Sequence, residues 1–300
     1  MLQRFLDPAV LASLSSLDLV AKTVVDGFVA GLHRSPKFGF SQEFAEYAQY
    51  VPGDDLRHVD WNVYARTERL FLKRFKGETN MQLLLLLDAS ASMTFGSVPH
   101  RTGRLRKIDY ARFVAASLAH LSSQQRDATG LIVFDEDVSN YIAPSTRQGQ
   151  LHRILHAIEQ AEGKARTDFT KPFIHFQQFL RRRGIVVVIS DFYEQPEKIV
   201  QACEPLRFRG NEVVLFHILD PQEIAPRFRD PVLLEDVETA TALEVSPDYA
   251  RHEYKAKIDQ HMKTLADKAA ASGLEYVFMN TSKPLDDALR NYLFLRQRRR

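Results

Sequence analysis

The sequence predicts an α/β fold, a doubly wound and mostly parallel sheet with helices on both faces. Two runs, Leu83–Leu87 and Ile185–Ile189, consist only of apolar residues. Strands that are apolar on both sides are buried on both faces, which is typical of parallel sheets. Between them, Lys107–Leu121 carries apolar side chains at helical spacing. This alternation of buried strands with amphipathic helices favours the α/β class.

The first 80 residues have a different pattern of apolar residues and are expected to form an N-terminal segment that packs on the main domain. Apolar residues recur at helical spacing up to Gly31, and shorter aromatic-rich pieces follow. The expected pieces are a helix over 11–29, extended chain over 38–51, a turn at Pro52–Gly53, a short helix capped by Asp54, and a strand over 70–75.

Residues 81–295 form the main domain, in which strands and helices alternate. Residues 231–245 alternate like a hairpin that leaves the sheet edge, and residues 296–300 form a basic tail. The remaining expected strands are 130–134, 138–142, 213–219 and 276–279, and the remaining expected helices are 151–161, 172–183, 196–208, 247–271 and 285–295.

Composition excludes several classes of protein. The 300 residues are 45% apolar and 26% charged, as in ordinary globular chains, and the formal net charge is only +2. A balanced charge supplies no general attraction to nucleic acid or anionic lipid. Cys203 is the single cysteine, which fits a reducing compartment, and no apolar run approaches the roughly 20 residues that cross a bilayer. These observations predict a soluble cytoplasmic protein.

Oxygen-bearing side chains follow both apolar runs at the point where each expected strand ends. Asp88, Ser90 and Ser92 follow the first run, and Asp191 follows the second. Open α/β sheets bind ligands at the carboxyl ends of their strands. Carboxylate and hydroxyl oxygens suit Mg²⁺, so the sequence predicts a magnesium site. The alternative is that these residues only cap helices. Alanine at position 88 or 191 is expected to preserve the fold and abolish Mg²⁺-dependent binding of a partner.

The pattern Asp88-x-Ser90-x-Ser92, with a later threonine and an aspartate after a further apolar strand, resembles the metal-ion-dependent adhesion site of von Willebrand factor A domains. The resemblance implies Thr167 as the threonine ligand, although Lys164-Ala165-Arg166 stands where that family often has Gly-Gly. It also implies that the bound Mg²⁺ captures a carboxylate of a protein partner and that the domain performs no catalysis.

The segment Tyr50–Trp61, with Pro52-Gly53-Asp54-Asp55 within it, is followed by Ala65-Arg66-Thr67. Together these residues resemble the signature of bacterial proteins in the domain of unknown function 58 family. That resemblance implies a MoxR-type AAA+ ATPase as a partner, with which the protein would act on client proteins. Asp54, Asp55 and Arg57 are expected to be scaffold residues, with a docking edge for the ATPase as the alternative.

Two other interpretations stay open. A haloacid-dehalogenase-like phosphatase would use Asp88 as a nucleophile beside Mg²⁺, but it needs a second carboxylate where Ser90 stands. A structural subunit without metal is the other. The basic runs at Arg104–Lys107, Arg181–Arg183 and the C-terminal tail are expected to be solvated, because no aromatic residues interleave with them as nucleic-acid stacking requires.

Overall fold

The computed structural model describes residues 7–14, 16–32, 44–49, 59–75, 81–100, 103–162, 169, 172–173, 176, 183–228, 230–235 and 242–298. The chain divides into two compact units. One, here called the sheet unit, comprises Met1–Phe28 and Met81–Arg300, and the other, the small unit, comprises Val29–Asn80.

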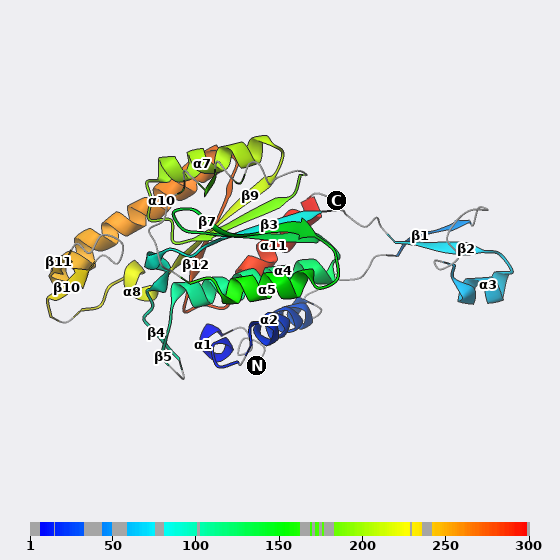
Figure 1. Ribbon diagram of the computed structural model, residues 1–300, viewed down its shortest axis with the longest axis horizontal. Helices are drawn as coiled ribbons and strands as arrows, with labels where there is room; N and C mark the ends of the chain where they lie inside the picture. Colours follow the sequence, from blue (N-terminus) through cyan, green and yellow to red (C-terminus); the bar gives the residue numbers. More distant parts are fainter. Residues whose placement is uncertain are drawn as a thin grey trace. The chain divides into compact units, whose positions relative to one another are not determined.

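A six-stranded sheet forms the centre of the sheet unit, with strand order β12-β9-β8-β3-β6-β7 (Figure 1). All neighbouring strands run parallel except β7, which pairs with β6 in the antiparallel direction. This arrangement confirms the predicted fold class. The strands are β3 (Gln82–Asp88), β6 (Ala128–Phe134), β7 (Val138–Ser145), β8 (Ile185–Ser190), β9 (Glu212–Leu219) and β12 (Glu275–Asn280).

Helices cover both faces of this sheet. Successive side chains of a strand point to opposite faces. Leu84 and Leu86 accordingly join a buried cluster with residues of α7 (Pro196–Phe208) and α10 (Lys255–Ala271). The opposite face is covered by α4 (Lys107–Gln124), against which α5 (Gln150–Glu159) and α11 (Asp286–Arg298) pack (Figure 1).

Three described phenylalanines after residue 168 belong to the core. Phe169, Phe173 and Phe176 are buried, and their rings each lie 5.6 to 5.9 Å from the ring of Phe134 at the end of β6. Aromatic pairs prefer such edge-on contacts.

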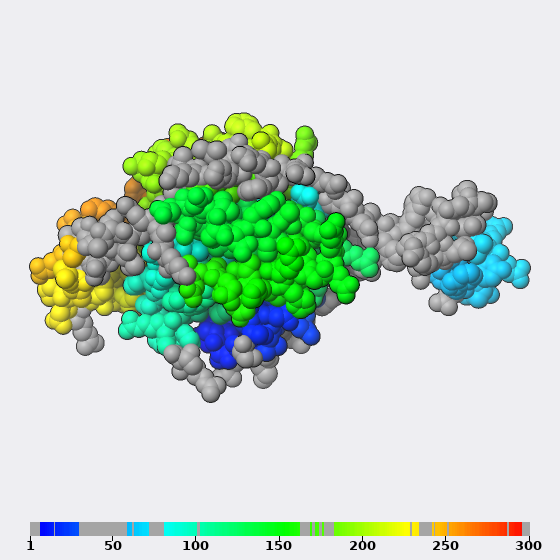
Figure 2. Space-filling model, in the orientation of Figure 1, coloured from blue at the N-terminus to red at the C-terminus, as the bar shows by residue number. Residues whose placement is uncertain are grey.

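The first residues pack on the sheet unit. Asp7 caps the short helix α1 (Pro8–Leu11), and α2 (Leu17–Leu32) buries one apolar face. Figure 2 shows these helices, in blue, as part of the surface of that unit. The sequence-based prediction places residues 1–80 in one segment, whereas the structure joins the first 28 to the main domain, because the apolar face of α2 is covered there. The buried residues of α2 are Leu17, Val20, Ala21, Val24, Val25 and Phe28.

The small unit contains an antiparallel pair, β1 (Phe44–Gln49) and β2 (Phe71–Phe75), and the helix α3 (Trp61–Thr67). The buried Asp60 accepts a hydrogen bond from the backbone N–H of Val63 at 3.3 Å, so it caps α3. The expected turn at Pro52–Gly53 and the cap and docking residues Asp54, Asp55 and Arg57 lie outside the described residues.

Shorter elements complete the sheet unit. The hairpin expected within residues 231–245 is present as β10 and β11, and α11 continues beyond the expected end at residue 295 to Arg298. None of the helices in the described ranges is long and apolar enough to span a membrane. The shorter elements of the sheet unit are η3 (Ala91–Thr94), β4 (Val98–His100), β5 (Gly103–Leu105), α8 (Pro221–Ile224), β10 (Val232–Glu235), β11 (Ala242–Val245), α9 (Pro247–Tyr249) and the π-helical turn η4 (Ala250–Tyr254).

Candidate metal centre

Asp88 and Asp191 lie at the carboxyl ends of the two central strands. Asp88 is the last residue of β3, and Asp191 follows the last residue of β8, its parallel neighbour. From β3 the chain continues to β6 on one side and later returns to β8 on the other. The ends of β3 and β8 therefore flank the switch point at which α/β sheets bind ligands. Both aspartates are buried.

Both carboxylate oxygens of Asp88 accept hydrogen bonds. Oδ1 accepts from the backbone N–H of Ser90 at 2.9 Å, and Oδ2 accepts from the hydroxyl of Ser190 at 2.6 Å. The same Ser190 Oγ accepts from the backbone N–H of Phe192 at 3.0 Å. One hydroxyl thus connects the end of β3 to the turn that carries Asp191.

The turn after Asp191 is conformationally unusual. Phe192 has a φ of 48°, in the left-handed region that bulky side chains rarely adopt. Its ring is fully buried and stacks on Phe169 at a centroid distance of 5.5 Å. Burial of the ring and the bond from its N–H to Ser190 hold this strained backbone, which costs on the order of 1–3 kcal/mol. The strained turn fixes the direction in which the chain leaves Asp191.

Ser90 and Ser92 present their hydroxyls to each other. Their Oγ atoms are 3.0 Å apart, at the start of the 3₁₀ turn η3. Ser90 is the N-cap residue of η3, but its side chain makes no capping bond and contacts Ser92 instead. This separation is that of a hydrogen bond between the two hydroxyls, and adjacent oxygens around Mg²⁺, at metal–oxygen distances near 2.0–2.1 Å, stand about 3.0 Å apart as well.

Lys107 is buried beside this site, which overturns one expectation from the sequence. It belongs to the basic run Arg104–Lys107, expected to be solvated, but its side chain is 0% exposed. Its Nζ donates to Asp191 Oδ2 at 2.8 Å and to Glu223 Oε1 at 2.6 Å, and it lies 4.7 Å from the ring centre of Tyr193. Burial lowers the pKa of Lys107, but the two carboxylates outweigh it and leave that pKa above its ordinary value. The lysine is therefore a buried cation.

Glu223 is fixed at the first turn of α8. Its Oε2 accepts from the backbone N–H of Asp220 at 2.9 Å while Oε1 faces Lys107. Asp220 in turn accepts from the backbone N–H groups of Gln222 and Ser97, at 2.9 and 2.8 Å. Reciprocal caps of this kind hold a helix start in one geometry. The ion pair with Lys107 therefore joins α8 to α4 and to the end of β8.

Burial, and next the nearby Asp191, raise the pKa of Asp88 from 3.8 to about 7, against the opposing hydrogen bonds from Ser190 and Ser90. A negative charge at Asp88 is thus disfavoured unless a cation is close. The donor set of two carboxylates and two hydroxyls, with no sulfur or imidazole, fits a hard divalent cation.

The raised pKa of Asp88 predicts how stability changes with pH. Because this pKa is higher in the folded than in the unfolded chain, the folded state holds the extra proton between about pH 4 and 7. The contribution of Asp88 to the free energy of unfolding should therefore fall as pH rises through this window. Urea denaturation in EDTA at pH 5 and 8 tests this: Asp88→Asn should lose less stability between the two pH values than the parent, and an equal loss would contradict the assignment.

Replacing Ser190 with alanine should destabilise the fold by about 1–3 kcal/mol, because it leaves Asp88 Oδ2 and the Phe192 N–H without their shared partner. Urea denaturation measures this loss. Ser139→Ala, at an exposed serine that donates to the Val133 carbonyl at 3.0 Å, is the control with a smaller expected loss. A Ser190→Ala variant as stable as the control would show that the hydroxyl does not join the two strand ends.

Two further residues, Thr167 and His217, remain to be considered. Thr167, the threonine implied by the family resemblance, lies outside the described residues. His217, within β9, is a buried histidine whose Nδ1 lies 2.8 Å from the Tyr276 hydroxyl. Burial lowers the pKa of His217 to about 3, so its imidazole is neutral. It serves as a core residue of β9.

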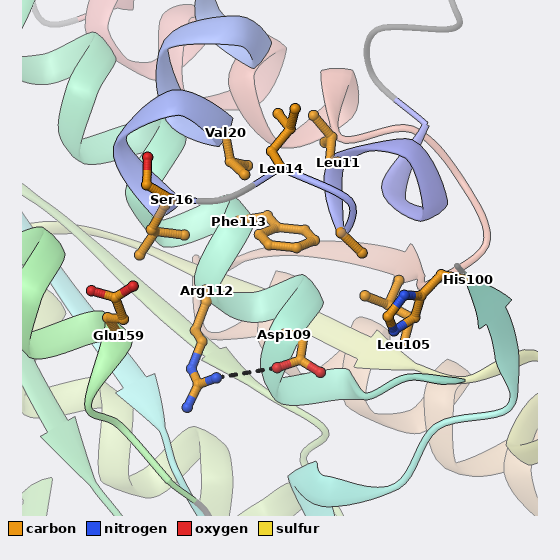
Figure 3. A pocket seen from close by; sticks show the side chains of 12 residues that line it. Leu11, Leu14, Ser16, Val20, His100, Leu105, Asp109, Arg112, Phe113 and Glu159 are labelled. Carbon is orange, nitrogen blue, oxygen red and sulfur yellow. Dashed lines mark hydrogen bonds and ion pairs between the residues drawn. The ribbon is translucent and has the colours of Figure 1, made fainter. Parts of the chain in front are cut away.

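A separate cavity of about 270 Å³ lies between the N-terminal helices and α4 (Figure 3). Its walls include Leu11 and Leu14 on one side and Phe113 of α4 on the other, with the ion pair of Asp109 and Arg112 at its edge. At 100° per residue these α4 positions lie on the opposite side of the helix from Lys107. Asp88, Ser90, Ser92 and Asp191 are not among the described residues that line this cavity.

Comparison with known proteins gives several matches. Residues 46–264 match the family described as "Protein of unknown function DUF58". The uncharacterized proteins Mb1516 of Mycobacterium bovis and Rv1480 of Mycobacterium tuberculosis are each 29% identical over 98% of this chain and 91% of their own length. Among solved structures, BatB of Bacteroides thetaiotaomicron has a TM-score of 0.49 at 14% identity, covering 73% of this chain and 99% of that one. The VWA domain of SpRpn10 has a TM-score of 0.41 at 12% identity, covering 70% and 94%.

The mostly parallel sheet, with acidic and hydroxyl residues at its switch point, defines a doubly wound α/β protein. Because the family match covers most of its length, the chain belongs to the DUF58 family.

Proposed function

We propose that this protein is a non-enzymatic adaptor that binds a protein partner through a divalent cation, with Mg²⁺ as the expected ion. Asp88, Ser90, Ser92 and Asp191 would hold the ion, together with Thr167 as implied by the family resemblance. When bound there, a divalent cation would supply Lewis acidity toward a carboxylate of the partner.

The observation that best supports the proposal is the proximity of the carboxyl ends of β3 and β8. Asp88 and Asp191 approach closely enough that Asp191 raises the pKa of Asp88, while the hydroxyls of Ser90 and Ser92 stand at the separation of adjacent magnesium ligands. These groups come from two loops more than 95 residues apart in the sequence, as the numbering of Ser92 and Asp191 gives. Capping alone does not account for such convergence.

Two exposed aromatic side chains adjoin the site. Phe95 follows η3 and is 41% exposed, and Tyr193 lies two residues after Asp191 and is 45% exposed. Aromatic residues at the edge of a binding site contribute contact area at low entropic cost. In this proposal they contact apolar atoms of the partner that flank its acidic residue.

Binding rather than turnover is supported by the surroundings of Asp88. A nucleophilic aspartate of the haloacid-dehalogenase type needs a second carboxylate as proton donor two residues further on, and Ser90 stands there. We therefore expect no release of phosphate from an aryl phosphate in the presence of Mg²⁺. Turnover that disappears in Asp88→Asn would instead support the phosphatase alternative.

The proposed partner is a MoxR-type AAA+ ATPase, acting on client proteins together with this adaptor. This part of the proposal is supported by the family resemblance. The test is co-elution of the purified protein with a MoxR-type ATPase in size-exclusion chromatography. Because the ATPase itself needs Mg²⁺, the comparison is between the parent and Asp88→Asn at constant Mg²⁺, with the exposed Asp259→Asn as control. Equal co-elution of all three would overturn the role of the metal site in partner binding.

A further inference from the structure

Lys107 occupies a position where a lysine is normally unfavourable. It is the first residue of α4, and a positive charge at a helix N-terminus opposes the helix dipole. Its side chain is also fully buried, which is costly for an unpaired ammonium. The contacts to Asp191 and Glu223, at 2.8 and 2.6 Å, offset both costs. The acids and the lysine therefore form one electrostatic unit with the proposed metal centre.

The net charge of this unit follows from its four ionisable side chains. Asp88, Asp191 and Glu223 are three carboxylates, and Lys107 is the buried ammonium that contacts two of them. With all four ionised the sum is −2, which one divalent cation neutralises. Without the lysine the sum would be −3 in a buried location, where like charges repel strongly.

We propose that Lys107 is the resident cation of this site. By pairing with Asp191 it allows the strand ends to fold with no metal bound, and by its positive charge it opposes a divalent ion, so that metal binds reversibly rather than as an obligatory part of the fold. This inference rests on the proposed function for the location of the ion and adds a residue that sets its affinity.

The experiment measures the dissociation constant of Mn²⁺, as a spectroscopic substitute for Mg²⁺, by electron paramagnetic resonance at pH 8 in four proteins. These are the parent, Lys107→Met, Glu223→Gln and the double variant Lys107→Met/Glu223→Gln. Their charge sums are −2, −3, −1 and −2. Lys107→Met should bind Mn²⁺ more tightly than the parent, and Glu223→Gln more weakly, each by roughly tenfold or more, with the double variant near the parent. The matched control, Lys255→Met at the exposed pair with Asp259, should bind like the parent.

Melting temperatures provide a second readout. In EDTA, Lys107→Met should melt below the parent, and Mn²⁺ should raise its melting temperature more than that of the parent. If Lys107→Met fails to fold, Glu223→Gln and the double variant still decide the matter through the predicted weakening and its reversal.

The failures of the two proposals are distinguishable. If the parent binds Mn²⁺, and Glu223→Gln has the same dissociation constant or Lys107→Met binds Mn²⁺ more weakly, then the role of Lys107 is overturned. The proposed metal centre is supported in that case. Absence of Mn²⁺ binding in the parent together with binding by Lys107→Met supports the resident cation and overturns the metal-dependent adaptor. Absence of binding in every variant overturns both.

Discussion

Replacing Asp191 with alanine is expected to lower the free energy of unfolding by about 3–5 kcal/mol, as does removal of one partner from a buried ion pair elsewhere. The substitution leaves the ammonium of Lys107 buried with Glu223 as its remaining carboxylate. Urea denaturation in EDTA measures the loss. The sequence alone suggests that alanine at position 191 preserves the fold, because it gives no sign that the aspartate pairs with a buried lysine.

The control for this prediction is an exposed ion pair. Asp259→Ala breaks the contact of Asp259 with Lys255, in which both side chains are about half exposed. Such surface pairs contribute about 0–1 kcal/mol. If Asp191→Ala costs no more than Asp259→Ala, then the pair of Lys107 and Asp191 is not part of the folded protein.

Replacing Asp88 with asparagine is expected to weaken Mn²⁺ or Mg²⁺ binding by about 100-fold or more. Loss of a residue that only orients a metal ligand already lowers metal affinity by about 10–100-fold, and Asp88 would be a ligand itself. Asparagine has nearly the same shape and keeps an oxygen for the N–H of Ser90. The fold should therefore be preserved, which circular dichroism checks, while isothermal titration calorimetry measures the binding.

Asp259→Asn, far from the strand ends in sequence and exposed, removes an equal charge and should leave the titration unchanged. Undiminished Mn²⁺ binding by Asp88→Asn would mean that the ion binds elsewhere on the chain.

The fold follows from the sequence because its strongest signals are local. β3 and β8 are apolar on both sides over five residues each, and only a sheet covered on both faces satisfies such strands. The same logic finds Asp88, Ser90, Ser92 and Asp191, since each follows an apolar run within a few residues and the ends of parallel strands meet at one edge.

The remainder of the site depends on contacts that no local pattern carries. Lys107 lies 84 residues from Asp191 and 116 from Glu223 in the sequence. In the sequence it stands beside two arginines, and basic runs of this kind are usually solvated. Its position as the first residue of a helix that begins near a ligand-binding edge was the available signal, because a cation there opposes the helix dipole. Ser190 directly follows the apolar run Ile185–Ile189, but no local pattern shows that its hydroxyl bonds to Asp88, 102 residues away.

The most direct test of the central claim is a crystal of the protein soaked in Mn²⁺, with anomalous diffraction data collected near the manganese absorption edge. We predict one strong anomalous peak at the carboxyl ends of β3 and β8, within bonding distance of oxygens from Asp88, Ser90, Ser92 or Asp191. The absence of a peak there at millimolar Mn²⁺, with Lys107 still paired to Asp191, would contradict it.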